Sequence, residues 1–425
     1  MTDEAASGAR AAGAREPDAV AAGRERDPVA AGRELDPVAE AWAARPSTTQ
    51  DLPSRADLVV VGGGLMGTAT AWAAARRGLS VILLEQFELG HSKGSSHGSA
   101  RILRRAYLDP LYVRLTGEAM PLWRELEADS GRDLLRITGG IDHGRRRDPE
   151  GIARVLDAAG VEHELLDAGS AAARWPGMVF DGPVLFHPQA GTVDAALTVL
   201  AATEVAERQG AVVLANTTVL RLDVTDDDVR VVTAAGAVRA RRVVVAAGAW
   251  AGELLDGVVP MPRLTVSQQQ VFHFPHRDET PNWPVTVHDQ DLVAYHLPGA
   301  RDAGPRGGRK VAEHMAPNAE TTADGRSGVV DPAARARLVA HVQRWLPGLA
   351  PEPYAETTCL YTSTSNEDFV LDRVGPVVAC SPCSGHGAKF APLIGRMAVD
   401  LATGDAAPEP RFRFRAHAQG AATDR

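Results

Sequence analysis

The stretch Asp57-Leu-Val-Val-Val-Gly-Gly-Gly-Leu-Met-Gly67 decides the fold. The apolar residues that follow the aspartate predict a buried strand, and the glycines after them predict a tight turn. From Thr68 to Arg77 the chain is rich in alanine and predicts a helix, which Gly78 ends. A second apolar run, from Ser80 to Leu84, predicts a neighbouring strand. Together these segments predict the βαβ unit of a doubly wound parallel sheet.

The glycines of this turn have the spacing of a dinucleotide-binding loop. Gly62 permits the turn, Gly64 lets the backbone approach a pyrophosphate, and Gly67 lets the helix pack against the strand. Met66 lies in the same loop, where the helix N-terminus offers partial positive charge to phosphates. Glu85, directly after the second strand, would accept hydrogen bonds from an adenosine ribose. A glycine-rich turn alone is a weak signal, but with both strands and the acid it predicts a bound dinucleotide.

Two later segments favour FAD over NAD. In a nicotinamide enzyme short βα units should follow promptly, whereas here the polar loop Gly90–Ser99 leads into Arg101–Arg105. A flavin ring needs such a loop to wrap it. The apolar strand within Arg242–Trp250 ends in small residues, including Gly248, where backbone must come close to the cofactor. The sequence therefore predicts a Rossmann-type FAD-binding domain that is assembled from separated pieces of the chain.

The remaining segments predict a second domain. Strand-rich stretches interrupted by proline, Pro262–Phe274 and Leu292–His314, predict an antiparallel sheet, and Asp331–Trp345 predicts a helix. The expected fold class is α/β, or α+β overall, with an antiparallel-sheet substrate domain beside the FAD-binding domain. The expected boundaries are 55–138, 190–262 and 365–412 for the FAD-binding domain, 139–189 and 263–364 for the substrate domain, and 1–54 and 413–425 for two tails.

The N-terminal segment differs in composition from the rest. Val20–Pro28 and Val29–Pro37 form a near-perfect tandem repeat of alanine, glycine, proline and mixed charge. Such a segment has little apolar surface to offset its chain entropy, so it predicts a disordered tail over residues 1–54. A docked helical element is the alternative.

Composition limits the partners. The formal net charge of −9 argues against nucleic acid, because phosphate binding needs a basic face. No apolar run is long enough to span a membrane and no signal-peptide core is present, so we expect a cytoplasmic protein without a membrane partner. Three cysteines are too few for a disulfide scaffold, and no metal site is expected. Cys380 and Cys383 have the spacing of a redox dithiol, but their place at a strand end favours simple burial.

Five strings carry a family resemblance: Val61–Gly67, Ser95–Arg104, Ala246–Trp250, Cys359–Thr362 and Ser384–Phe390. In this order and at these separations they resemble the monomeric sarcosine oxidase and N-methyltryptophan oxidase family, flavoenzymes of the D-amino-acid oxidase superfamily. The resemblance covers about residues 56–405. It implies that a secondary amine of an amino acid is oxidised to an imine, which water hydrolyses, while oxygen becomes hydrogen peroxide. It also implies a monomer whose partners are an amino-acid substrate and molecular oxygen.

The resemblance implies roles for residues around the flavin. Cys359 matches the family cysteine that forms a thioether with the flavin ring, although a buried free cysteine is the alternative. Tyr361 resembles a wall of the flavin pocket. His97 and the catalytic residue Arg101 resemble residues near the opposite face of the ring, where either side chain has phosphate or backbone binding as its alternative.

A second group resembles the family's substrate site. Arg104 and Lys389 match the pair of cations that holds the substrate carboxylate, with a solvated basic turn as the alternative for Arg104. Lys389 and Gly385 are also expected to contact the cofactor. His386, in the same string, is expected among the catalytic residues.

The substrate-domain hairpin supplies the remaining candidates. Lys310-Val-Ala-Glu-His314 resembles a family motif in which the lysine reaches the flavin and the histidine lies near the substrate amine. Residues four apart in a strand share a face, so both side chains can point inward. Tyr295 belongs to the same hairpin. The preceding loop, Gly299–Arg309, is longer than expected, and Arg309 is an alternative for the role of Lys310.

Two departures from the family pattern bear on the substrate. Ala388 stands where relatives often carry phenylalanine, and Pro382 replaces an expected glycine. The smaller side chain at 388 should widen the pocket, so sarcosine itself is not expected to be the best substrate. We expect a sarcosine-type N-methyl amino acid or a cyclic one. Two other functions stay open: a dehydrogenase that passes electrons to a protein or quinone, and a flavin-binding protein without turnover.

Overall fold

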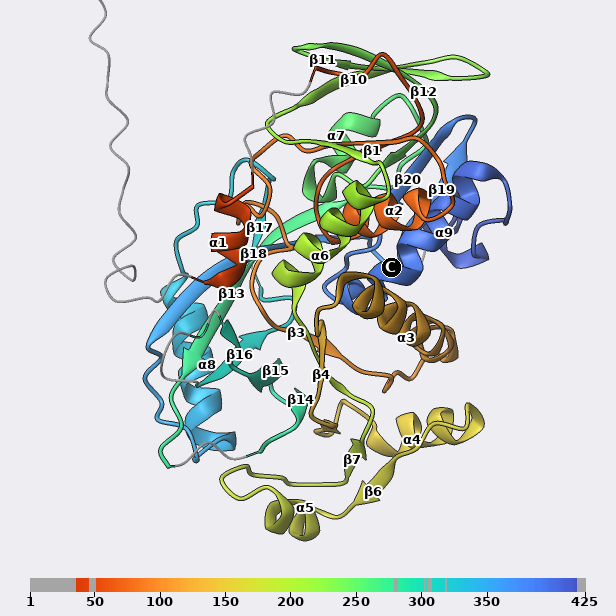
Figure 1. Cartoon of the computed structure of the whole chain (residues 1–425). Coiled ribbons are helices and arrows are strands. Elements are labelled where there is room, and N and C mark those ends of the chain that lie inside the picture. Colours follow the sequence, from red (N-terminus) through yellow and green to blue (C-terminus); the bar gives the residue numbers. More distant parts are fainter. Residues whose placement is uncertain are drawn as a thin grey trace, which may run out of the picture. The chain divides into compact units, whose positions relative to one another are not determined.

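The computed structural model describes residues 36–45, 51–278, 282–301, 303, 308–317 and 319–418. Its first sheet is built around the predicted βαβ unit (Figure 1). β1 (Arg55–Val61) pairs in parallel with β2 (Val81–Leu84) and β12 (Gly236–Val245), and α2 (Leu65–Ala75) connects β1 to β2. The other strands of this sheet are β9 (Val212–Leu214), β10 (Val219–Val224), β11 (Val229–Thr233), β19 (Val370–Val374) and β20 (Val377–Ser381).

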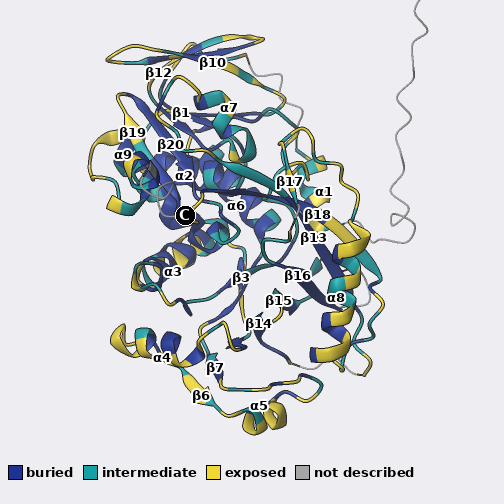
Figure 2. Ribbon diagram, turned by 180° about the vertical axis from the view of Figure 1, so that it is seen from behind, coloured by how far each residue is buried: buried dark blue, intermediate teal, exposed yellow. Residues whose placement is uncertain are grey.

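Both faces of the first sheet are buried, as the colours of its central strands show (Figure 2). Leu58 and Val60 of β1 belong to the core on the helical face, whereas Val59 and Val61 belong to the core on the opposite face. This division explains why β1 is apolar throughout, since alternate side chains of a strand point to opposite faces. The helical core is formed by α2, α3 (Pro110–Ser130), α6 (Ala195–Arg208) and α9 (Ala391–Thr403).

The second sheet contains the predicted hairpin. β15 (Val293–Pro298) and β16 (Arg309–Glu313) pair antiparallel, and β13 (Thr265–Phe274) pairs antiparallel with β16 and with β18 (Ala355–Ser363). α8 (Pro332–Trp345) packs on this sheet, and its outward residues are exposed (Figure 2). The other elements of this part are β5 (Gly140–His143), α4 (Pro149–Ala158), β6 (Glu164–Leu166), α5 (Ala168–Arg174), β7 (Val184–His187), β14 (Val285–Asp289) and β17 (Glu320–Thr321).

The second sheet is antiparallel apart from one pair of strands. β14 pairs in parallel with β5, whereas β14 and β15 form an antiparallel pair. The strands β5 and β14 are far apart along the chain and are not joined by a tight turn, so no hairpin dictates their direction. A long connection of this kind is not visible in local sequence.

The strands of the first and second sheets come from different parts of the sequence. All strands of the first sheet, and those of a small third sheet, lie within 55–138, 190–262 and 365–412. All strands of the second sheet lie within 139–189 and 263–364. We keep these boundaries as a proposal about domains. The third sheet consists of β3 (Arg101–Leu103), β4 (Leu135–Ile137) and β8 (Gly191–Val193).

The structure differs from the predicted N-terminal tail at residues 36–45. α1 (Pro37–Ala43) begins after Asp36, whose side chain accepts a hydrogen bond from the Val38 amide at 3.0 Å. Val38 is buried, and Asp36 also pairs with Arg301. A cap, a buried apolar residue and a long-range ion pair stabilise a helix that composition alone did not predict. Residues 1–35, which hold most of the tandem repeat, and 46–50 lie outside the described residues.

A short helix lies within the predicted C-terminal tail of residues 413–425. α10 (Phe414–Ala418) buries Phe414 and His417. The ring nitrogens of His417 lie 3.0 Å from the Asn366 side-chain oxygen and 3.1 Å from the Phe369 carbonyl. Contacts with a distant loop therefore fix this helix, and they have no signal in local sequence.

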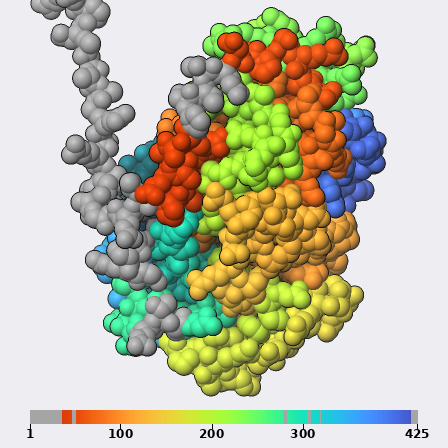
Figure 3. Space-filling model, in the orientation of Figure 1, coloured from red at the N-terminus to blue at the C-terminus, as the bar shows by residue number. Residues whose placement is uncertain are grey.

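Two further features concern the surface. On the face that Figure 3 shows, the surface of α3 (orange) adjoins that of α4 (yellow). In the part of the chain that the structure describes, no helix combines the length and the apolar character needed to cross a membrane.

Candidate active site

A cavity of about 1270 Å³ lies between the first and second sheets. Pockets for one small ligand usually span about 300 to 1000 Å³, so this cavity has room for a cofactor and a substrate. It brings together every residue predicted for the site except Gly67. Those that line it are Gly62, Gly64, Met66, Glu85, His97, Arg101, Arg104, Gly248, Tyr295, Lys310, His314, Cys359, Tyr361, Gly385, His386 and Lys389.

The turn between β1 and α2 requires glycine for steric reasons. Gly62 has a φ of 107°, and a Cβ there would lie 2.5 Å from the Ala246 carbonyl oxygen. A Cβ on Gly67 would lie 1.8 Å from the Gly62 carbonyl oxygen, which explains why Gly67 packs inside the turn and does not line the cavity. Gly64 is the N-cap of α2. The turn therefore offers bare backbone at a helix N-terminus, which fits the pyrophosphate of a dinucleotide.

Glu85 lies at the end of β2, as predicted. Its carboxylate accepts hydrogen bonds from the amides of Gly63, at 2.6 Å, and Phe87, at 2.9 Å. Burial raises the pKa of Glu85, but hydrogen bonds from His91, Gly63 and Phe87 outweigh it and hold the pKa below its usual value. An ionised acceptor thus stands at the cavity wall where a ribose would need one.

Arg104 and Lys389 both lie near one aromatic ring. The Arg104 guanidinium carbon is 4.0 Å from the centre of the Tyr107 ring, and the Lys389 Nζ is 5.7 Å from it. Lys389 is only 4% exposed, and its Nζ donates a hydrogen bond to the His386 carbonyl oxygen at 2.5 Å. Burial lowers the pKa of both cations, and the charge of Arg104 lowers that of Lys389 further. An anion bound between them would offset both costs.

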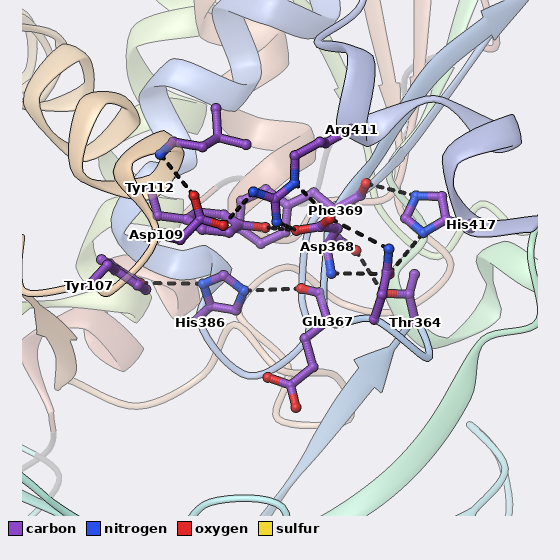
Figure 4. A network of polar contacts seen from close by, with 12 residues as sticks. Tyr107, Asp109, Tyr112, Thr364, Glu367, Asp368, Phe369, His386, Arg411 and His417 are labelled. Carbon is purple, nitrogen blue, oxygen red and sulfur yellow. Dashed lines mark hydrogen bonds and ion pairs between the residues drawn. The ribbon is translucent and has the colours of Figure 1, made fainter. Parts of the chain in front are cut away.

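A polar network connects Tyr107 with His386 and the loop at Glu367 (Figure 4). The Tyr107 hydroxyl lies 3.3 Å from Nδ1 of His386, and Nε2 of His386 lies 3.2 Å from the Glu367 carbonyl oxygen. Burial and the charge of Lys389 hold the pKa of His386 well below its usual value. His386 is therefore a neutral link between the ring and the loop at Glu367.

The same network contains residues that the sequence did not suggest. Arg411, next to α10, pairs with Asp368 and with Asp109, which caps α3. The Tyr112 hydroxyl donates a hydrogen bond to Asp368 at 2.8 Å. Tyr107 was also missed, although its place three residues after Arg104 was a usable signal. The other members come from separate segments, so no local pattern connects them.

His314 and Tyr361 form a second group in the cavity. Their ring centres are 5.7 Å apart. Burial lowers the pKa of His314 to about 4, and the charges of Arg104, Lys389 and Arg147 contribute. Burial raises the pKa of Tyr295 to about 12, and Tyr295 shares a hydrogen bond with Tyr361. At neutral pH these three side chains are therefore uncharged.

β16 separates two neighbouring cations. The Lys310 Nζ donates a hydrogen bond to the Ala100 carbonyl oxygen at 3.1 Å, and Lys310 lines the cavity together with His314. Arg309 points to the opposite face, where its Nε lies 2.7 Å from Nδ1 of His296. Arg309 is 1% exposed and does not line the cavity, which rules it out as a substitute for Lys310. The alternation of side chains along a strand explains the difference.

Arg101 holds the polar loop that precedes it. Its guanidinium donates hydrogen bonds to the carbonyl oxygens of Ser95, at 3.0 Å, His97, at 2.6 Å, and Ala100, at 2.9 Å. The backbone-binding alternative thus describes what the Arg101 side chain does in this structure. Arg101 also lines the cavity, so its positive charge lies at the cavity wall.

All three cysteines are free. Cys359 lies in β18, is 7% exposed and faces the cavity. Burial raises the pKa of Cys380 to about 12 and also raises that of Cys383, although hydrogen bonds oppose it at Cys383. Two thiols held protonated in this way suit a structural role better than a redox one. Among the described residues no cluster of histidine, cysteine and acidic side chains is arranged to hold a metal ion.

Comparisons with known proteins agree with this geometry. The family model described as FAD dependent oxidoreductase matches residues 57–401. Monomeric sarcosine oxidase of Streptomyces avermitilis is 34% identical over 81% of this chain and 93% of its own length. Peroxisomal sarcosine oxidase of Homo sapiens is 32% identical (81% and 91%), and N-methyl-L-tryptophan oxidase of Escherichia coli is 29% identical (81% and 94%).

Solved structures give the same result. NikD, an unusual amino acid oxidase essential for nikkomycin biosynthesis, superimposes with a TM-score of 0.76 at 27% identity in its open form. The match covers 84% of this chain and 96% of that one. The glycine turn, the cavity and these matches lead to one conclusion: the chain belongs to the FAD-dependent oxidoreductases, in the family of the monomeric sarcosine oxidases and N-methyl-L-tryptophan oxidases.

Proposed function

We propose that this protein is an oxidase of a secondary or cyclic α-amino acid. The substrate C–H and N–H bonds lose two electrons and two protons to give an imine, which water hydrolyses to an aldehyde or ketone and an amine. Molecular oxygen takes up the two electrons and two protons and becomes hydrogen peroxide. The observation that carries the proposal is the pair Arg104, which is half-buried, and Lys389, which is buried. Both line the cavity that the glycine turn and Cys359 also line.

The residues of the cavity fit FAD. The cofactor supplies a two-electron acceptor when bound. The turn at Gly62 and Gly64 would hold its pyrophosphate, and Glu85 its ribose. Cys359 would form the thioether, with Tyr361 beside the ring. His97, Gly248 and Gly385 line the same cavity and would complete the contacts.

The electrostatics of the cavity favour a particular form of the substrate. A carboxylate between Arg104 and Lys389 would offset their desolvation, with the arginine supplying two parallel donors and the lysine a point charge. The same cations disfavour a second positive charge nearby. The substrate amine should therefore bind neutral, with the uncharged His314 close to it.

The shape of the cavity supports a substrate larger than sarcosine. Ala388 and Pro382 both line it, and a methyl group at 388 leaves space that a phenylalanine would fill. Met66 approaches the same turn, since a Cβ on Gly387 would lie 3.5 Å from its Cε. We therefore propose an N-methyl or cyclic amino acid with a bulky side group.

Lys310 is the proposed contributor to the oxygen half-reaction. Reduction of oxygen begins with a one-electron step that creates superoxide, and a fixed cation stabilises that charge only as it forms. The hydrogen bond from Lys310 to the Ala100 carbonyl oxygen fixes the position of its ammonium group.

We also propose that the protein acts as a cytoplasmic monomer.

One experiment separates the proposal from its rivals. N-methyl and cyclic amino acids are mixed with the enzyme without oxygen, and loss of the flavin absorbance is recorded before air is admitted and peroxide measured. An oxidase bleaches with at least one amine and forms peroxide. A dehydrogenase bleaches without peroxide, and a silent flavoprotein does not bleach with any amine.

The thioether has its own test. Acid-precipitated protein should stay yellow, and the Cys359→Ala variant should release its FAD to the supernatant. Free FAD from the unmutated protein would contradict attachment at Cys359.

A further inference from the structure

Arg326 connects the strand of Cys359 with the polar loop of residues 90–99. Its Nη1 donates hydrogen bonds to the carbonyl oxygens of Ser92, at 2.7 Å, and Lys93, at 3.1 Å. Its Nε and Nη2 donate to the Thr358 hydroxyl at 3.0 and 2.8 Å, and Nη2 also reaches the Thr358 carbonyl. None of the motifs in the sequence includes this arginine.

These contacts hold the residue that precedes the thiol. Thr358 immediately precedes Cys359 in β18. Immediately after it, the Leu360 carbonyl oxygen accepts a hydrogen bond from the Ser95 hydroxyl at 2.5 Å. The polar loop is thus tied to both neighbours of Cys359, on one side through the guanidinium of Arg326.

The segment that carries Arg326 is itself fixed. The Trp250 indole nitrogen donates a hydrogen bond to the Asp324 carboxylate at 2.9 Å. The Gln268 side chain accepts from the Gly328 amide at 3.0 Å and donates to the Val329 carbonyl oxygen at 3.0 Å. The positive charge therefore has a defined place and is not a freely moving surface group.

The guanidinium of Arg326 is a fixed cation bound to the residue directly before Cys359. Burial lowers the pKa of Arg326, and the charge of Cys359 opposes that effect. In general, an arginine beside a cysteine favours the thiolate form. The thiolate, and not the thiol, is the nucleophilic form of cysteine.

We propose that Arg326 is a positioning residue for Cys359, which holds the thiol strand against the polar loop and places a fixed positive charge beside that strand. This inference rests on the proposed attachment of FAD at Cys359. Arg326, which lies outside the catalytic motifs, would act before the first turnover.

The first test measures the thiol without flavin. The full chain is produced under riboflavin limitation and treated with iodoacetamide, and modification of the Cys359 peptide is followed by mass spectrometry. Arg326→Gln should alkylate about tenfold more slowly near neutral pH, because the thiol loses a neighbouring cation and the strand that carries it loses its link to the loop. Arg326→Lys keeps the charge and should stay within about threefold of the unmutated protein. Arg263→Gln, at a side chain that is 87% exposed, is the matched control and should alkylate normally.

The second test adds FAD and measures the acid-stable fraction over time. Both Arg326→Gln and Arg326→Lys should incorporate FAD at least several-fold more slowly, because lysine cannot bridge Thr358, Ser92 and Lys93 at once. Unchanged alkylation in a folded Arg326→Gln protein would overturn the proposal. If that variant does not fold, normal incorporation by Arg326→Lys would overturn it instead. Free FAD from the unmutated protein would contradict only the attachment at Cys359. The alkylation test does not depend on flavin, so its result would still stand.

Discussion

The two faces of the second sheet bury polar groups for different purposes. On the face toward α8, His143 of β5 and His288 of β14 stack with ring centres 4.0 Å apart, and Arg309 contacts His296. On the cavity face, Lys310 lines the cavity together with the hydroxyls of Tyr295 and Tyr361 and the thiol of Cys359. Burial holds the histidines of the α8 face neutral, whereas the cavity face presents charge where a ligand can use it.

Burial by itself therefore does not identify a functional residue. Arg309 and Lys310 are adjacent, positively charged and almost fully buried, yet they belong to opposite faces. Arg309 satisfies carbonyl oxygens of Trp283 and Pro284 and so stabilises the fold. Substitutions on the two faces should therefore change different measured quantities.

The largest effect is expected at the carboxylate clamp. Arg104→Ala and Lys389→Ala should each weaken a competitive carboxylate inhibitor by roughly thirty-fold to several-thousand-fold, because removing one cation of a desolvated site costs on the order of 2 to 5 kcal/mol. Titration of the flavin spectrum with the inhibitor measures this. Arg174→Ala, at a surface ion pair with Glu164, serves as control. Unchanged inhibitor affinity in both clamp variants would mean that these residues do not bind the carboxylate.

The next effect compares the two neighbouring cations of β16. Lys310→Met removes the charge but keeps length and apolar packing, so reoxidation of the flavin by oxygen should slow by at least about a hundred-fold. Reduction by substrate should change much less. Stopped-flow spectra of each half-reaction measure both rates.

Arg309→Met is the matched control for Lys310→Met. It should lower the melting temperature, because His296 and two carbonyl oxygens lose their donor, and leave reoxidation close to normal. An unaltered oxygen rate in Lys310→Met would remove that lysine from the oxygen reaction. A slowed one in Arg309→Met would break the division between the two faces.

Acid should destabilise the α8 face. Burial lowers the pKa of His341, on α8, to about 3, and that of His143 to about 3, against about 6.5 in an unfolded chain. Above pH 6.5 both states hold these rings neutral. As the pH falls from 6.5 towards 3 the unfolded chain takes up protons first, so the free energy of unfolding should fall by about 1 to 2 kcal/mol per histidine by pH 5.

A pair of leucine variants tests this acid effect. His341→Leu should flatten the loss of stability between pH 7 and pH 5, measured by urea unfolding, by about one histidine's share. His143→Leu should flatten the slope by a similar amount. The explanation fails if both variants lose stability with the same pH dependence as the unmutated protein.

The smallest effect is expected at Tyr107. Its ring lies beside both clamp cations, and a cation–π contact is worth about 0.5 to 2 kcal/mol. Tyr107→Leu should therefore weaken carboxylate binding by about twofold to thirtyfold, while Tyr107→Phe keeps the ring and should bind almost normally. Equal weakening in the two variants would instead assign the effect to the hydroxyl bonded to His386.

The sequence alone determined the cofactor part of this protein. The strand, the glycine turn and the helix that follow Asp57 depend on neighbours in the chain, so their pattern predicted β1, α2 and β2. The five family strings predicted the FAD-dependent family, to which the chain belongs. Strand alternation also predicted that Lys310 and His314 share a face, and both line the cavity.

The contacts around those motifs depend on the tertiary structure. Arg326 meets Ser92 across 234 positions of the chain, and Arg411 meets Asp109 across 302. The helix α1, the parallel pairing of β5 with β14 and the stacked histidines likewise depend on distant segments. A local pattern encodes the conformation of its own backbone. The packing of whole sheets and helices determines which buried charges become partners. A charge that loses its hydration needs a partner, and that partner can come from any part of the chain.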